Sequence, residues 1–164
     1  MGEMFLKIQG VEGESMDQAS PKSHQNEIEI RNWNWITTCN VRWDVNQGGQ
    51  STNIKFDTIK IDKIVDKATV VLYQCCVTGK HIPKAWITCR KNDGDQKVEY
   101  LIVELDDIIV NKVAFDGSGE EQNLKEQIEL SFAQFHMDYK LQQDSGAGSG
   151  QVGFGMNIQT MKKV

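Results

Sequence analysis

The chain has 164 residues, a formal net charge of −5 and an apolar fraction of 39%. These values suit a single domain over residues 1–164 with a sizeable core, and they exclude a largely disordered chain. Lysine and arginine form no stripe along the sequence, so nothing indicates nucleic-acid binding, which needs clustered cations.

The chain carries no recognisable targeting or membrane signal. Residues 1–10 lack the basic segment, apolar core and cleavage site of a secretory leader, and no apolar run reaches the length of a membrane span. We therefore expect synthesis in the cytoplasm without a signal peptide, and no membrane insertion. The four cysteines lack metal-ligand spacing, so reduced thiols are expected at Cys39, Cys75, Cys76 and Cys89.

A short strand is predicted over Met4–Gln9, and a polar connection to Asn26 follows it. The next strand, Glu27–Trp35, changes its alternation phase partway along. Its apolar side chains lie first on one face and then on the other, in the order Ile28, Ile30, Trp33, Trp35. Successive strand side chains point to opposite faces, so the strand must contain an extra residue or cross between two surfaces.

The segment 37–52 is predicted to be an extended, hairpin-like arm. Its apolar side chains alternate cleanly with polar ones up to a flexible tip at 46–50, and the alternating pairs include Val41, Arg42, Trp43 and Asp44. Residues 53–64 are predicted to return as one strand. The single helix is predicted over Thr69–Thr78, with Thr69 capping its start and Gly79 ending it in the left-handed conformation.

Strands dominate the sequence after Pro83. Residues 85–90 alternate, Asn92-Asp93-Gly94 favours a tight hairpin, and two strands are predicted over Lys97–Leu105 and Ile108–Asp116. We interpret Asp106-Asp107, between these two strands, as a solvated turn rather than a catalytic carboxylate pair.

The last third of the chain is predicted to hold a second bent strand, a linker and a terminal strand. The bent strand, 124–139, changes phase after Phe132, as Glu27–Trp35 does after Ile30. Residues 142–151 have the composition of a flexible linker. Alternation resumes at Val152, and we expect this terminal strand to pair with a sheet edge of its own chain or of a neighbour.

Long bent strands suit a closed barrel better than a flat sheet. The sequence therefore predicts a mainly β fold: a closed barrel of antiparallel strands with one short flanking α-helix and a protruding loop. The expected core side chains include Ile28, Ile30, Trp33, Trp35, Leu130 and Phe132. A nucleic-acid stacking surface is the alternative for the two tryptophans, but no cations lie near them. Asn32 and Asn34 face the other way.

No motif indicates an enzyme. His24, His81 and His136 are far apart, no nucleophile elbow or phosphate loop occurs, and no ligand spacing suggests a metal. We expect no catalytic residue, no cofactor and no bound metal. A monomeric barrel that holds a small ligand in its interior stays an alternative.

Several segments, in order along nearly the whole chain, resemble the haemolysin-coregulated protein family, Hcp, of the bacterial type VI secretion system. They are Met4–Ile8, Gly10–Ser15, His24, Glu27–Ile30, Trp33-Asn34-Trp35, Ile64–Thr69, Cys76, Gly79–Pro83, Val98–Ile102 and Glu129–Ala133. Each segment is weak evidence alone, but the ordered set is specific.

The resemblance implies a barrel similar to phage tail-tube proteins, with six copies in a ring and rings stacked into a tube. A contractile sheath expels this tube, with a spike at its tip, and the tube lumen carries or chaperones effector proteins. By similarity Asn34, with Asn32 on the same strand, faces the lumen. The arm residues Val41, Arg42, Trp43 and Asp44 contact the adjoining ring. The protein would thus be made in the cytoplasm and secreted through the type VI machine.

Overall fold

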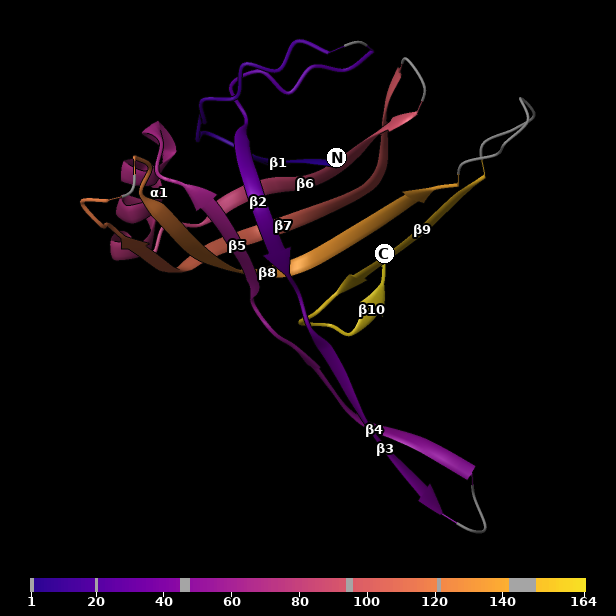
Figure 1. Ribbon diagram of the computed structural model, residues 1–164. Helices are drawn as coiled ribbons and strands as arrows, with labels where there is room; N and C mark the ends of the chain where they lie inside the picture. Colours follow the sequence, from indigo (N-terminus) through magenta and orange to yellow (C-terminus); the bar gives the residue numbers. More distant parts are fainter. Residues whose placement is uncertain (1, 20, 45–47, 94–95, 121, 142–149) are drawn as a thin grey trace.

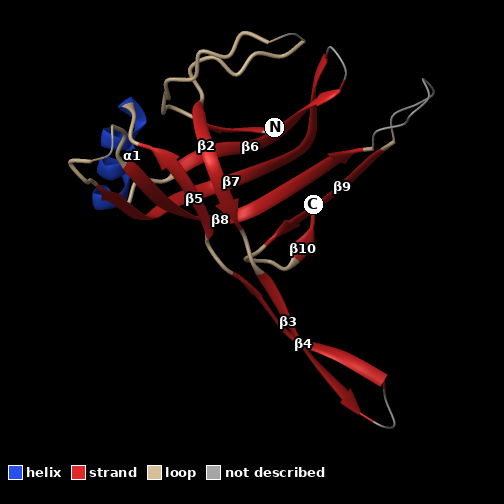
Figure 2. Cartoon of the chain, viewed as in Figure 1, coloured by secondary structure: helices blue, strands red, loops and turns tan. Residues whose placement is uncertain are grey.

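The computed structural model describes residues 2–19, 21–44, 48–93, 96–120, 122–141 and 150–164. This part of the chain contains one helix among strands (Figures 1 and 2). The elements are β1 Glu3–Ile8, β2 Ile28–Asn34, β3 Thr37–Asp44, β4 Gly48–Phe56, β5 Ile59–Ile64, α1 Lys67–Thr78, β6 Ile82–Asp93, β7 Gln96–Asp116, β8 Lys125–Lys140, β9 Gln151–Asn157 and β10 Lys162–Lys163.

Six strands close into an antiparallel barrel, as the sequence predicted. They pair in the order β8-β5-β2-β1-β6-β7, and β7 also pairs with β8. This last pairing joins the two ends of the sheet and leaves no open edge between them. β9 and β10 continue the sheet from the outer side of β8, beyond the closure. The terminal strand therefore pairs with its own chain.

Both predicted changes of phase coincide with a change in strand pairing, a β-bulge in β2 and a change of partner in β8. The register of β2 against β5 shifts between Ile30 and Asn32, which marks a β-bulge at the change of phase. β8 pairs with β5 along Lys125–Leu130 and with β9 along Gln134–Lys140. Because its partner changes between these halves, β8 crosses from one surface of the barrel to another.

Apolar side chains fill the barrel interior. Ile28, Ile30 and Leu130 are buried in it, whereas Trp33, Trp35 and Phe132 are partly buried and pack against the core. The ring centroid of Trp35 lies 4.8 Å from that of Phe135 and 5.4 Å from that of Phe132. This packed interior argues against the alternative of a barrel that encloses a small ligand.

The prediction of two strands joined by a solvated turn at Asp106-Asp107 is wrong, because β7 runs unbroken through both residues. Asp106 pairs with Lys84 of β6 and Gln134 of β8, and its carboxylate contacts both side chains. Asp107 takes a positive φ of 52° within the strand, and its carboxylate contacts His81. Partners on both sides thus keep the strand continuous despite its two adjacent acidic residues.

The segment predicted as one strand over residues 53–64 is two strands, β4 and β5, because the chain leaves β4 at Asp57. The helix begins earlier than predicted. Asp66, rather than Thr69, is its N-cap, and the Thr69 side chain completes a capping box by bonding back to the Asp66 backbone. Gly79 ends the helix with φ 63°, as expected. In the described chain, no helix combines the length and apolarity needed to cross a bilayer.

The predicted arm is the two-stranded sheet β3–β4, which extends to Phe56 and projects away from the barrel (Figure 1). Within the described residues this hairpin pairs with no other strand. The predicted tip at 46–50 and linker at 142–151 lie partly outside the described residues. Gln151, counted in the linker, already begins β9.

At Gly13, the connection between β1 and β2 packs closely against the backbone of Asn26 and Glu27. The Gly13 amide donates to the Asn26 carbonyl at 2.8 Å, and the Ser15 amide donates to the Glu27 carbonyl at 3.0 Å. A Cβ atom at position 13 would lie 2.4 Å from the Glu27 carbonyl oxygen, so only glycine fits without moving the backbone.

We expect Gly13→Ala to lower the free energy of unfolding by about 1–3 kcal/mol, since overpacking against backbone cannot relax locally. Gly10→Ala is the matched control. Gly10 has φ 81° but open space around it, so only the conformational cost of roughly 1 kcal/mol applies. Urea denaturation monitored by tryptophan fluorescence compares the two. Equal losses in both variants would contradict the close approach at Gly13.

Candidate assembly surfaces

The outward face of β2, β5 and β8 carries a polar ladder that begins at Asn32. Asn32 donates to the Asp62 carboxylate at 3.3 Å, and Gln127 donates to the other oxygen of the same carboxylate at 2.9 Å. These residues are cross-strand neighbours, Asn32 with Asp62 and Asp62 with Gln127. Their side chains therefore form one continuous row across three strands.

Asn34 begins a second row beside the first. It lies opposite Lys60, which lies opposite Glu129, and Glu129 in turn lies opposite Lys112 of β7. Glu129 accepts hydrogen bonds from Thr58 at 3.0 Å and from Lys112 at 3.4 Å. Asn32 and Asn34 are both exposed. This face is thus a hydrophilic wall, backed by the buried isoleucines of the same strands.

The arm carries apolar side chains into solvent. Trp43 is 80% exposed and Val41 48% exposed, and Ile54 of the facing strand is also exposed. A two-stranded hairpin alone is marginally stable in water. Because β3 and β4 form a separate sheet with no third strand among the described residues, the arm offers apolar area and strand edges to a partner.

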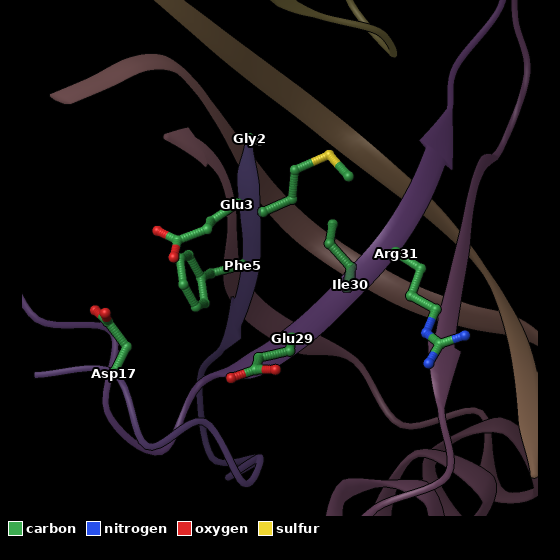
Figure 3. Close-up of a pocket in the computed structure, with 8 residues that line it drawn as sticks. Gly2, Glu3, Phe5, Asp17, Glu29, Ile30 and Arg31 are labelled. Atoms are coloured by element: carbon green, nitrogen blue, oxygen red, sulfur yellow. The ribbon is translucent and has the colours of Figure 1, made fainter. Parts of the chain in front are cut away.

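A surface pocket between β1 and β2 gathers acidic side chains, which Figure 3 shows together with Arg31. Glu3 and Asp17 are nevertheless committed to buried Arg90, whose Nη2 atom lies 2.7 Å from each carboxylate. The hydrogen bond from Arg90 lowers the pKa of Asp17 well below its ordinary value. Arg31 points away from both carboxylates (Figure 3). The ion pairs of Glu3 and Asp17 with Arg90 hold the β1–β2 connection against β6, so these carboxylates are not placed for acid–base chemistry.

His24 lies in the same connection, between two carboxylates. Its Nδ1 atom is 2.7 Å from Glu27 and its Nε2 atom is 2.9 Å from Glu99. The Nδ1 contact is a hydrogen bond and the Nε2 contact is a close ion pair, so the ring is paired with both carboxylates only when both of its nitrogens carry protons. Burial acts to lower the pKa of His24, but the hydrogen bonds to the two carboxylates prevail and raise it to about 9. The imidazolium also stacks on Phe5 at 4.3 Å between centroids.

The same contacts stabilise the partner carboxylate. Burial acts to raise the pKa of Glu99, but hydrogen bonds from His24 and Lys22 lower it to about 2. Each acid and base of this cluster is therefore neutralised by another. In the described residues no group of three or more His, Cys, Asp or Glu side chains is arranged to hold a metal ion.

A second charged cluster joins α1 to the barrel. The Lys63 ammonium is fully buried, and it donates to Glu126 at 2.6 Å, Asp66 at 2.8 Å and the Ile64 carbonyl at 2.8 Å. Thr69 also donates to Glu126. The helix cap and two strands of the barrel thus share one ion pair.

Comparison with known proteins agrees with this geometry. Residues 5–139 match the family described as "Type VI secretion system effector, Hcp". The chain belongs to the Hcp family. It is 38% identical to the protein hcp1 of Pseudomonas aeruginosa over 158 residues, which covers 96% of this chain and 95% of the relative. The resemblance inferred from the sequence is thereby confirmed.

Solved Hcp structures share the fold over nearly the whole chain. The crystal structure of Hcp1 from Salmonella typhimurium superimposes with a TM-score of 0.78 at 31% identity, covering 99% of each chain. A type VI secretion system effector from Yersinia pestis gives a TM-score of 0.73 at 30% identity, covering 94% of this chain and 99% of the other. The barrel and its flanking helix are therefore the Hcp fold.

The structure places Asn32 and Asn34 together on the hydrophilic wall and places the backbone of Val41–Asp44 on the arm, away from that wall. Sequence reasoning missed the buried ion pair of this Hcp-family chain. Its signal was present, because Lys63 shares the phase of Ile59 and Ile61, and Glu126 shares that of Ile128 and Leu130. Arg90 gave no such signal, since the β1–β2 connection that buries it is irregular.

Proposed function

We propose that this Hcp-family chain is a structural subunit of the type VI secretion inner tube and not an enzyme. Six copies form a ring, rings stack through the arms, and the lumen carries or chaperones effector proteins. The observation that carries the proposal is the β3–β4 arm, which projects from a closed barrel as a separate two-stranded sheet and carries an exposed Trp43. Such an element gains its stability from a partner.

In this proposal the hydrophilic wall around Asn32 and Asn34 lines the lumen, and Val41, Arg42, Trp43 and Asp44 contact the adjoining ring. The wall supports this role because its exposed side chains are polar, and its Asp62 and Glu129 carboxylates accept hydrogen bonds from neighbouring amide and ammonium groups. The sheath and spike-tip proteins of the machine are the other partners. The whole chain acts as one tube domain, is made in the cytoplasm and leaves the cell through the machine.

Negative-stain microscopy of the purified protein tests the ring directly. We expect ring-shaped particles, and sedimentation at micromolar concentration should give the mass of six copies. A strictly monomeric species across that range contradicts the proposal.

Trp43→Glu should leave single rings intact and abolish their stacking, because a charge cannot be buried against an apolar neighbour without large cost. Met16→Glu is the matched control, since Met16 is 75% exposed on the β1–β2 connection. Microscopy of concentrated protein counts stacked and single rings. Equal stacking in the two variants would remove the arm from the ring-to-ring contact.

Asn34→Glu should keep the rings and alter the retention of effectors, because it adds a carboxylate to the hydrophilic wall opposite Lys60. Co-purification of an effector with wild-type and variant rings measures the change. If the rings themselves dissociate, Asn34 belongs to a subunit contact and not to the lumen.

A further inference from the structure

A surface pocket lies at the root of the arm, where the chain leaves the barrel after β2 and returns to it before β5 (Figure 1). The Asp57 amide donates to the Ile36 carbonyl at 3.0 Å and ties the outgoing and returning segments together. The pocket has a volume of about 400 Å³, near the lower end of the roughly 300–1,000 Å³ of small-ligand sites. It therefore suits one or two side chains rather than a folded segment. We call it the arm-root pocket, and its lining includes Asn34, Ile36, Phe56, Asp57, Lys60 and Glu129.

The arm-root pocket opens on the hydrophilic wall but has one apolar side. Asn34, Lys60 and Glu129 form the second row of that wall, and all three line the pocket. The apolar side consists of Ile36, which is 48% exposed, and Phe56, which is partly buried. A ligand that enters from the wall therefore meets polar and apolar side chains together.

Core aromatic side chains hold the apolar side in place. The ring centroid of Phe56 lies 5.8 Å from that of Phe135 and 6.4 Å from that of Trp35. Phe56 thus packs against the core and also contributes to the pocket. Because this side chain is already ordered, a ligand that packs on it costs little conformational freedom of the protein.

The carboxylates around the pocket are already paired. Thr58 and Lys112 donate to different oxygens of Glu129, at 3.0 Å and 3.4 Å. The Asp57 carboxylate lies 2.9 Å from the ammonium of Lys55. These two acidic groups are therefore not available to a ligand.

The ammonium of Lys60 is the charge that is left for a ligand. Lys60 is exposed, and within the parts of the chain that the structure describes it forms no ion pair and no side-chain hydrogen bond. An ammonium beside an apolar surface fits a carboxylate that is attached to an apolar group. The C-terminus of a polypeptide has this chemistry when its last residue is apolar. A chain end also needs room for the backbone on one side only, which suits a small pocket.

We infer that the arm-root pocket binds the C-terminal residue of an effector protein, with the apolar side chain against Ile36 and Phe56 and the carboxylate at Lys60. The inference rests on the proposed function, in which the hydrophilic wall lines the lumen. It adds the chemistry that is recognised there, an apolar last residue with a free carboxylate. The last residue then distinguishes effectors that fit the pocket from effectors that do not.

Titration calorimetry on the purified wild-type protein tests the inference. The probe is an acetylated tetrapeptide that ends in leucine, compared with its C-terminal amide and with the same peptide ending in serine. We expect saturable binding of the leucine acid and about 10-fold weaker binding of each comparison peptide, because one loses the charged hydrogen bond and the other the apolar contact. Equal binding of the acid and the amide overturns the role assigned to the carboxylate.

Variants of the protein locate the binding. Lys60→Met should weaken binding of the leucine acid by about 10-fold and leave the amide unchanged, whereas Ile36→Ser should weaken both peptides. Arg31→Met is the matched control, since Arg31 is an exposed cation of β2 outside the pocket. Circular dichroism confirms that each variant folds. Equal losses in Lys60→Met and Arg31→Met would show general attraction to positive charge and would overturn the site.

Octanoate distinguishes a peptide from a lipid, because a fatty acid combines an apolar group and a carboxylate in the same way. Binding of octanoate without binding of the peptide overturns the effector C-terminus as the occupant. Failure of every probe on protein that still forms rings overturns the binding site and leaves the proposed function intact. A monomeric wild-type protein contradicts the proposed function itself.

Discussion

Replacing Lys63 with Met is expected to lower the free energy of unfolding by about 3–5 kcal/mol, the usual cost of removing one partner from a buried ion pair. Lys63 and Glu126 are both fully buried, and their charged groups lie 2.6 Å apart. Without the ammonium, the Glu126 carboxylate has no counter-ion in an apolar interior. The N-cap Asp66 also loses its contact with Lys63, so the start of α1 loosens at the same time.

Lys60→Met is the matched control, because Lys60 lies on the same strand but faces solvent. Its effect should stay within about 0.5 kcal/mol. The double variant Lys63→Met with Glu126→Leu should recover at least half of the loss, because it leaves no unpaired charge in the core. Urea denaturation at neutral pH measures all four proteins. Equal losses in Lys63→Met and Lys60→Met would show that the pair adds nothing to the fold.

Stability is also expected to fall by no more than about 4 kcal/mol as the pH rises from about 6.5 to about 9, through the titration of His24. The folded protein holds the His24 proton with a pKa of about 9, against about 6.5 in an unfolded chain. A raised pKa stabilises the fold fully below the unfolded value, and this contribution is lost as the pH rises through the folded value. The folded and unfolded pKa values differ by about 2.5 units. Each unit corresponds to about 1.4 kcal/mol, and this product sets the upper limit of the effect.

The measurement is the difference in unfolding free energy between wild type and His24→Gln, taken at intervals from pH 6 to 10. The difference should shrink as the pH rises, because the variant has no proton to lose. His81→Gln serves as control, since His81 is exposed and its contact with Asp107 is also exposed. Glu99 affects stability at acidic pH instead. Because its pKa is lowered from 4.5 to about 2, its contribution to folding stability is present above about pH 4.5 and is lost as the pH falls toward 2. If this difference in unfolding free energy did not change with pH, it would contradict a protonated His24 in the folded protein.

The bulge in β2 could be predicted because alternation records which face of a strand each side chain occupies. Ile28, Ile30 and Trp33 cannot all face one interior unless the strand contains one extra residue. The register shift between Ile30 and Asn32 provides it. The terminal strand was predicted for the same reason, from Val152 onward. Local alternation was thus sufficient wherever one face of a strand is apolar.

The continuity of β7 was missed, because its local sequence favours a turn whereas its pairing with distant strands favours an unbroken strand. Two adjacent aspartates favour a turn, but Asp106 is bound by Lys84 and Gln134 from the two flanking strands. Such partners are distant in sequence, so they cannot be inferred from the residues that flank Asp106. His24 was correctly placed in the connection before Glu27, but its pairing was missed for the same reason, since its partner Glu99 is far along the chain. Which apolar side chains stay exposed, such as Tyr73 and Phe115, likewise depends on the three-dimensional fold and not on the local sequence.

The filled barrel has a consequence for transport. Leu6, Ile61 and Leu105 occupy the interior with no exposed surface, so one molecule encloses no space for a passenger. In the proposed ring, the lumen must therefore be enclosed by several subunits together, and its width depends on the number of subunits in the ring. Cargo size would then be tuned by the angle between neighbours, without any change to the hydrophobic centre that makes each unit rigid.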